Sequence, residues 1–161
     1  MAVATSSRRR NFEKKSQHLN AVFELFEERV VCGDYQHYKM RGKPAPDIFL
    51  VAAKEVLGRD VGELNAEPTI VQLEERAKGL VFEDALPGLQ AGKRAGMSGR
   101  APSELSKFHH INFILPLVVW VPDPNLLKFG HGVDEKADLL LRSLEEFKPE
   151  EWGLPPYPHS G

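Results

Sequence analysis

The fold is decided by the stretch Gly79-Leu-Val-Phe-Glu-Asp-Ala-Leu-Pro-Gly-Leu-Gln-Ala-Gly-Lys-Arg-Ala-Gly-Met97. It opens with the apolar run Leu80-Val-Phe82, which is typical of a buried strand in a parallel sheet. Glu83 and Asp84 follow at once, so we expect both carboxylates at the carboxyl edge of that sheet, where open α/β sheets bind ligands. Pro87 suits the first turn of a following helix.

Small residues recur at roughly helical spacing after this strand, at Ala85, Gly88, Gly92 and Ala95. They predict a helix that lies close to its sheet. The acidic pair has two interpretations. Glu83 and Asp84 are hard oxygen ligands of the kind that magnesium prefers, but they could equally stabilise the helix start, where free amide groups favour negative charge. This stretch alone leaves both open.

Composition limits the class of protein. The chain has 161 residues, 42% of them hydrophobic, which fits one soluble globular domain. A net charge of -2 indicates no nucleic-acid partner, and the single cysteine, Cys32, cannot form an internal disulfide. The longest apolar run, Ile111 to Val121, is shorter than the about 20 residues of a membrane-spanning helix. No signal peptide is recognisable before Arg8, so we expect no membrane partner and a cytoplasmic location.

The amino-terminal third predicts two short strands around a helix. Met1 to Ser7 begins as a strand and runs into Thr5, Ser6 and Ser7, which can cap the next helix. Arg8 to Glu28 predicts one helix with an apolar face, and Arg29-Val-Val-Cys-Gly33 predicts a second buried strand.

The middle of the chain presents a lysine from a stiff turn. Gly42-Lys-Pro-Ala-Pro46 is too rich in proline to be helical, so Lys43 projects from a loop. We expect Asp47 to cap the following helix, which Gly58 ends, and a short helix at Val71 to Ala77.

The carboxyl-terminal part predicts two further strands. These are Val118-Val-Trp-Val121 and Leu139-Leu-Leu141, and Ser143 with Glu146 predicts a capping box for a short last helix. Strands that alternate with helices indicate an α/β fold with a Rossmann-like, doubly wound parallel sheet.

Three segments resemble motifs II, III and IV of the haloacid-dehalogenase (HAD) superfamily of hydrolases. They are Ala4-Thr-Ser-Ser7 after a strand, Gly42-Lys-Pro-Ala-Pro-Asp47 before a helix, and Phe82-Glu-Asp-Ala-Leu-Pro-Gly88 after another strand. The segment Leu144-Glu-Glu-Phe-Lys-Pro-Glu-Glu-Trp-Gly-Leu-Pro-Pro-Tyr157 is similar to the closing part of the pseudouridine-5'-phosphatase-like branch. The likeness covers nearly the whole chain except about 99–117.

The resemblance assigns a role to each candidate site residue. Thr5 and the Ser6 amide match the phosphate-binding position, and Lys43 matches the lysine that steadies the phosphoryl group. Asp84 matches the principal Mg²⁺ ligand and Glu83 its acidic neighbour. Two plainer alternatives stay open: Thr5 as a simple helix cap, and Lys43 as a solvated loop lysine.

The sequence departs from the family pattern at its centre. Family members begin with a strand that bears an Asp-x-Asp motif, whose first carboxylate attacks phosphorus, and this sequence contains no Asp-x-Asp. The cap domain that the family uses for substrate choice is missing as well. Met1 corresponds to an internal methionine of family members, so we expect residues 1–161 to be a truncated HAD-like core from the carboxyl-terminal part of a longer enzyme. Within it, 99–117 form an unmatched insertion and 152–161 an extended tail.

The missing strand lies in the family between the strands of motifs II and IV, so its loss leaves two interior edges. Either these strands pair directly, or another segment such as Ile111 to Leu117 fills the slot; an open edge would favour self-association.

The resemblance therefore implies a magnesium-dependent phosphatase of a small phosphorylated metabolite, inactive as this chain. The alternative is a non-catalytic product that binds phosphate and magnesium or a partner chain. A nucleotide-binding module has little support, because Gly42-Lys43 lacks the glycine-rich lead of a P-loop.

Overall fold

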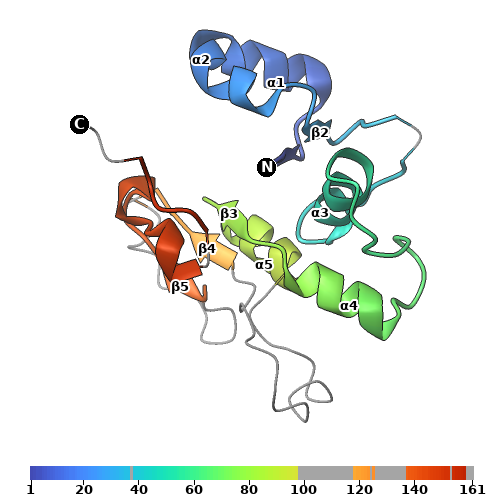
Figure 1. Ribbon diagram of the computed structural model, residues 1–161. Coiled ribbons are helices and arrows are strands. Elements are labelled where there is room, and N and C mark those ends of the chain that lie inside the picture. The colour runs from blue at the N-terminus through green and yellow to red at the C-terminus, as the bar shows by residue number, and fades with distance from the viewer. Residues whose placement is uncertain (37, 98–117, 124, 126–136, 153, 159–161) are drawn as a thin grey trace.

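The computed structural model describes residues 1–36, 38–97, 118–123, 125, 137–152 and 154–158, and shows short parallel strands flanked by helices (Figure 1). The elements in chain order are β1 (Val3–Thr5), α1 (Arg9–Ser16), η1 (Gln17–Leu19), α2 (Asn20–Phe23), η2 (Glu24–Phe26), β2 (Val30–Cys32), α3 (Asp47–Val51), the π-helical turn η3 (Ala52–Val56), α4 (Ile70–Ala77), β3 (Val81–Glu83), α5 (Leu86–Arg94), β4 (Val118–Trp120), β5 (Leu139–Leu140), η6 (Leu144–Glu146) and η7 (Pro149–Trp152). The α/β class predicted from the sequence is confirmed.

The strands form two parallel sheets. One pairs β1 with β2, with Val3 opposite Val30. The other has the order β3-β4-β5, with Val81 opposite Val118. Direct pairing of β1 with β3, one of the two expected ways to close the sheet, does not occur. The other candidate for the slot, 111–117, lies outside the described residues, as does the whole expected insertion 99–117.

The edges of β1 and β3 that face away from their partners are unpaired in the described part of the chain. Val3 N donates to Arg29 O at 2.9 Å, and Val121 N donates to Glu83 O at 2.8 Å. Since the peptide groups of alternate residues point to opposite sides of a strand, those of Ala4 and Phe82 point away from β2 and β4. These two residues therefore mark the open edges.

Helix α5 lies directly on the second sheet, as its small residues predict. Leu89 and Ala91 are fully buried. A Cβ added at Gly92 would lie 2.9 Å from Val118 Cγ2 and 3.3 Å from Val81 Cγ1, so only glycine allows this approach. The helix thereby follows the strand whose end carries the acidic pair.

Burial of β3 is less complete than its apolar run predicts. Val81 is buried, but Phe82 is 41% exposed. The ring of Phe82 packs edge-to-face against Phe147, with 4.9 Å between centroids. The face of β3 that Phe82 occupies is thus covered by the chain after β5 and not by a helix.

The single helix predicted for Arg8 to Glu28 is wrong in detail, because this run is broken into α1, η1, α2 and η2. At the first break Ser16 Oγ donates to the carbonyl of Phe12 at 2.9 Å, a local bond that competes with regular helical pairing. The predicted cap is also wrong. Residue Arg8 occupies the N-cap position, and the Arg9 amide donates to Asp34 Oδ1, 2.8 Å away, from the loop after β2.

The remaining sequence predictions fare better. Helix α4 is present and begins with a capping box of Thr69 and Gln72. Strands β4 and β5 lie where predicted. Before η6, Ser143 Oγ accepts from the amide of Glu145 instead of from that of Glu146. No helix in the described ranges is long and apolar enough to cross a membrane.

Candidate functional site

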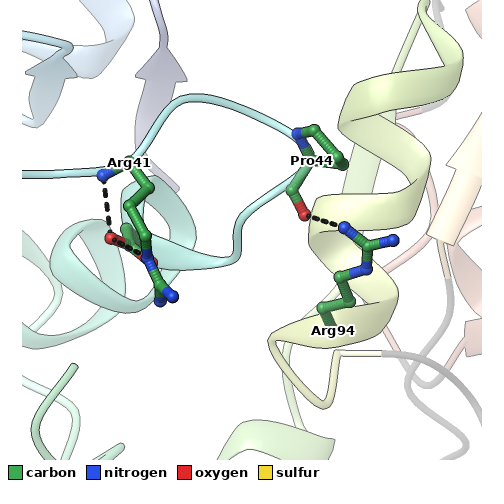
Figure 2. A network of polar contacts seen from close by, with 4 residues as sticks. Arg41, Pro44 and Arg94 are labelled. Atoms are coloured by element: carbon green, nitrogen blue, oxygen red, sulfur yellow. Dashed lines mark hydrogen bonds and ion pairs between the residues drawn. The ribbon is translucent and has the colours of Figure 1, made fainter. Parts of the chain in front are cut away.

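Lys43 is presented by a loop that is fastened at both ends. The turn itself closes through Ala45 N, which donates to Gly42 O at 3.0 Å. On one side Arg41 binds Asp47, and on the other Arg94 Nη1 of α5 donates to the carbonyl of Pro44 at 3.1 Å (Figure 2). The stiff turn predicted from its prolines is therefore anchored to two different helices.

Asp47 closes this loop and does not cap α3 as predicted. The N-cap residue is Pro46, and no side chain caps the helix. The Asp47 carboxylate instead accepts from the Arg41 amide at 2.9 Å and from its guanidinium at 2.7 Å. Burial acts to raise the pKa of Asp47, but the hydrogen bonds and charge of Arg41 outweigh it, so the pKa lies below the usual value. Asp47 is thus ionised and paired at neutral pH.

The ammonium group of Lys43 bridges the ends of the two sheets. Its Nζ donates to the carbonyl of Ala4 on β1 at 3.3 Å and forms an ion pair with Glu83 at the end of β3. It also lies 4.9 Å from the centroid of the Phe49 ring, which favours a cation. Only 15% of the Lys43 side chain is exposed. The alternative that Lys43 is a solvated loop lysine is therefore wrong.

Glu83 is the buried partner in this pair, with 8% of its side chain exposed. Burial raises the pKa of Glu83, and the charge and hydrogen bond of Lys43 offset part of the rise. The carboxylate lies against the first turn of α5, where a Cβ on Gly88 would approach Glu83 Oε2 to 1.9 Å. The alternative that Glu83 merely caps the helix start is wrong, because Ala85 is the N-cap residue of α5, no side chain caps the helix, and the charged partner of Glu83 is Lys43.

Asp84 differs from its neighbour because it is exposed. Its main-chain carbonyl accepts from the indole Nε1 of Trp120 at 2.9 Å, which ties the residue to β4. Within the described ranges the Asp84 carboxylate forms no hydrogen bond or ion pair.

These two carboxylates fit a magnesium site that is completed by other ligands. The described residues contain no group of three or more metal-binding side chains. Magnesium is commonly held by one or two carboxylates together with waters and phosphate oxygens. Exposed Asp84 fits the first ligand, whereas Glu83 is engaged with Lys43 and fits a neighbour better than a direct ligand.

Thr5 and Ser6 lie at the carboxyl end of β1, where the loops after β1 and β2 meet. Thr5 Oγ1 accepts from the amide of Ser7 at 3.2 Å, so Thr5 closes a local turn and is not the cap of α1. A Cβ on Gly33 would approach Ser6 O to 2.5 Å, so glycine lets the loops touch. Lys43 binds the carbonyl just before Thr5, but among the described residues no bond joins Thr5 or Ser6 to the acidic pair.

Three residues that shape the site were missed from the sequence, namely Arg41, Phe49 and Arg94. Gly88 was predicted as a small residue that lets its helix lie close to the sheet, but its close approach to the Glu83 carboxylate was not predicted. Arg94 lies 50 residues from its partner, and no local signal indicates such a contact.

The arrangement defines an α/β protein with a cation and exposed carboxylate at the carboxyl ends of parallel strands, a place suited to an anionic ligand. Residues 1–96 match the haloacid dehalogenase-like hydrolase family, and the chain belongs to this family. The resemblance predicted from the three motifs is therefore confirmed.

Individual relatives match nearly the whole chain. (DL)-glycerol-3-phosphatase 2 of Arabidopsis thaliana is 37% identical over 160 residues, which cover 99% of this chain and 51% of the relative. A probable pseudouridine-5'-phosphatase of Drosophila melanogaster is 36% identical over 155 residues, or 96% of this chain and 51% of that protein. A probable pseudouridine-5'-phosphatase of Saccharomyces cerevisiae is 30% identical over 161 residues, which cover 96% of this chain and 54% of that protein. The chain spans about half the length of these curated relatives.

Proposed function

We propose that this chain binds the phosphate group of a small phosphorylated metabolite at the carboxyl ends of β1 and β3. The observation that carries the proposal is the position of Lys43, whose ammonium lies between the two strand ends. An ammonium has three N–H donors, and the described contacts use two of them, on Ala4 O and Glu83. The third is left for a phosphate oxygen. All three relatives named above are phosphatases of small phosphorylated molecules by name, which supports this ligand class.

We further propose that Asp84 holds Mg²⁺ beside this phosphate, with Glu83 as its acidic neighbour. The ion would supply positive charge that neutralises phosphate oxygens. The protein's own part is to aim Lys43 from the other side and to present Thr5 and Ser6 at the end of β1, where a hydroxyl and a main-chain amide suit an anion.

Binding does not by itself produce turnover. The family's reaction needs a carboxylate nucleophile from an Asp-x-Asp strand, and the printed sequence has none. Loss of a covalent nucleophile costs orders of magnitude in rate, and charge stabilisation alone does not restore it. The proposal is therefore a HAD-like phosphatase chain that is inactive as it stands.

Hydrolysis of p-nitrophenyl phosphate tests this directly. With Mg²⁺ present, we expect the purified 161-residue chain to release nitrophenol no faster than the exposed-acid control Glu28→Ala and the site variant Asp84→Ala. Steady release by the parent and the control that is lost in Asp84→Ala would show that the chain is an active enzyme.

A non-catalytic partner-binding role is the second candidate, and the unpaired edges of β1 and β3 favour it. Strand edges without a neighbouring strand pair readily with another chain, so we propose that a second copy pairs with these edges, although the carbonyl of Ala4 already accepts from Lys43. Light scattering across a concentration series should then show dimers, with amide exchange at Ala4 and Phe82 slowed as they form. A monomer at every concentration, with both amides already protected, would contradict this role.

A further inference from the structure

The loop that carries Lys43 is held from outside by one residue of a different element, Arg94 at the end of α5. Its Nη1 donates to the carbonyl of Pro44, the residue immediately after the lysine, at 3.1 Å (Figure 2). Arg94 itself is exposed and contacts neither Glu83 nor Ala4 among the described interactions. Its contact therefore reaches the proposed phosphate site only through the main chain of this loop.

Helix α5 contacts both Glu83 and the loop that carries Lys43. At its first turn Gly88 lies against the Glu83 carboxylate, and at its last turn Arg94 holds the lysine loop. A helix is a rigid spacer with a fixed rise per residue, so its two ends move together. Helix α5 thus contacts both the lysine loop, at the carbonyl of Pro44, and the carboxylate of Glu83.

We propose that Arg94 is a positioning residue for Lys43, which keeps the ammonium between β1 and β3 and oriented for an anion. The other fastening, the ion pair of Arg41 with Asp47, ties the loop to α3, the helix that follows it. Among the described interactions it makes no contact with the strand that bears Glu83. Arg94 couples the loop to α5, the helix that follows Glu83 and Asp84, in addition to the direct ion pair of Lys43 with Glu83. The role in anion binding rests on the proposed function, but the coupling itself does not.

Chemical labelling of Lys43 measures the coupling without any ligand. The rate of acetylation by acetic anhydride is followed by mass spectrometry, with exposed Lys14 and Lys15 as internal references. Lys43 should react slowly in the parent, because it is largely buried and ion-paired. In Arg94→Ala the rate should rise about fivefold, the effect of losing one hydrogen bond, while the thermal unfolding midpoint stays where it is in the parent.

Two variants make the comparison specific. Arg94→Lys keeps a cationic donor and should restore most of the protection of Lys43. Arg10→Ala removes the same charge from an exposed position on α1 and should leave the Lys43 rate unchanged. Equal Lys43 rates in Arg94→Ala and Arg10→Ala would overturn the proposal.

Inorganic phosphate, titrated by calorimetry with Mg²⁺ present, separates the coupling from the function. If the parent binds phosphate, Arg94→Ala should weaken binding by about fivefold and Arg94→Lys should recover it. A parent that binds no phosphate would refute the proposed function, and the labelling rates would still decide the role of Arg94. Undiminished phosphate binding in Arg94→Ala, at any labelling rate, would refute Arg94 as a positioning residue for the anion.

Discussion

Two effects act on the pKa of Glu83 in opposite directions: burial raises it and the neighbouring Lys43 lowers it. Burial dominates, because the pKa of Glu83 is raised although the ammonium is in direct contact. Buried ion pairs commonly behave in this way, since removing both charges from water costs more than their attraction returns. The pair is therefore better understood as a device that holds Lys43 in place than as a source of stability.

The raised pKa predicts how stability depends on pH. The folded protein keeps the Glu83 proton to a higher pH than the unfolded chain, so the unfolding free energy falls as pH rises from about 4.5 through the folded pKa. Glu83→Gln cannot titrate and lacks this fall. Urea unfolding from pH 4 to 8 should show the parent losing stability relative to the variant as pH rises. A parent that gains stability relative to Glu83→Gln over that range would show that the effect of Lys43 on the pKa of Glu83 outweighs that of burial. Glu28→Gln, at an exposed position, is the control.

Gly88 gives a second prediction in which two effects have opposite signs. Helix propensity alone favours Gly88→Ala by about 1 kcal/mol. The added Cβ, however, would approach Glu83 Oε2 to 1.9 Å, and forcing atoms into a packed site costs about 1–3 kcal/mol. We expect a net loss of roughly 1 kcal/mol in unfolding free energy together with faster acetylation of Lys43. Gly42→Ala is the matched control, because its Cβ would meet nothing within 4 Å. A stabilised Gly88→Ala with unchanged labelling would contradict the geometry.

At the scale of elements, the lysine loop depends on a bond between its two flanks. The Asp47 side chain is 3% exposed and accepts from both the amide and the guanidinium of Arg41, whose side chain is 63% exposed. The buried carboxylate organises the loop, and the arginine is the solvated partner.

Substitution of Asp47 tests this description. Asp47→Ala leaves the Arg41 amide without its acceptor and should lower the unfolding free energy by about 2 kcal/mol at pH 7. Asp47→Asn keeps an acceptor and should lose only about 1 kcal/mol. Because the folded pKa of Asp47 is lowered, its contribution should disappear as the pH falls through that value. Equal losses in the two variants, measured by urea unfolding, would mean that the amide bond is unimportant.

The elements themselves were largely predictable, and the contacts between them were not. Apolar runs located β2, β3 and β4, and the small residues correctly predicted that α5 lies on its sheet. The predictions of one unbroken helix from Arg8 to Glu28, of its capping by Thr5, Ser6 or Ser7, and of capping by Asp47 were wrong. The helix breaks where Ser16 Oγ bonds the carbonyl of Phe12, Asp34 takes the place of the expected cap of α1, and Asp47 pairs with Arg41. The hydrophobic periodicity of a sequence carries no information about such partners.

At the scale of the whole molecule, the main feature is the separation into two parallel sheets joined at their carboxyl ends by Lys43. The interrupted sheet could be expected from the absent Asp-x-Asp strand. The ion pair that spans the interruption could not, because Lys43 and Glu83 are 40 residues apart. Motifs identify which residues belong to a site, whereas their mutual contacts depend on how the loops are anchored.

The central claim is that Lys43, held between the two strand ends, makes this edge a phosphate site. Calorimetric titration of inorganic phosphate into the parent and Lys43→Met, with and without Mg²⁺, tests it most directly. We predict saturable binding by the parent that Mg²⁺ strengthens and that Lys43→Met weakens by about tenfold or more, the loss of one charge-assisted hydrogen bond. Phosphate binding that is the same in Lys43→Met as in the parent, or no binding by the parent at all, would contradict the account.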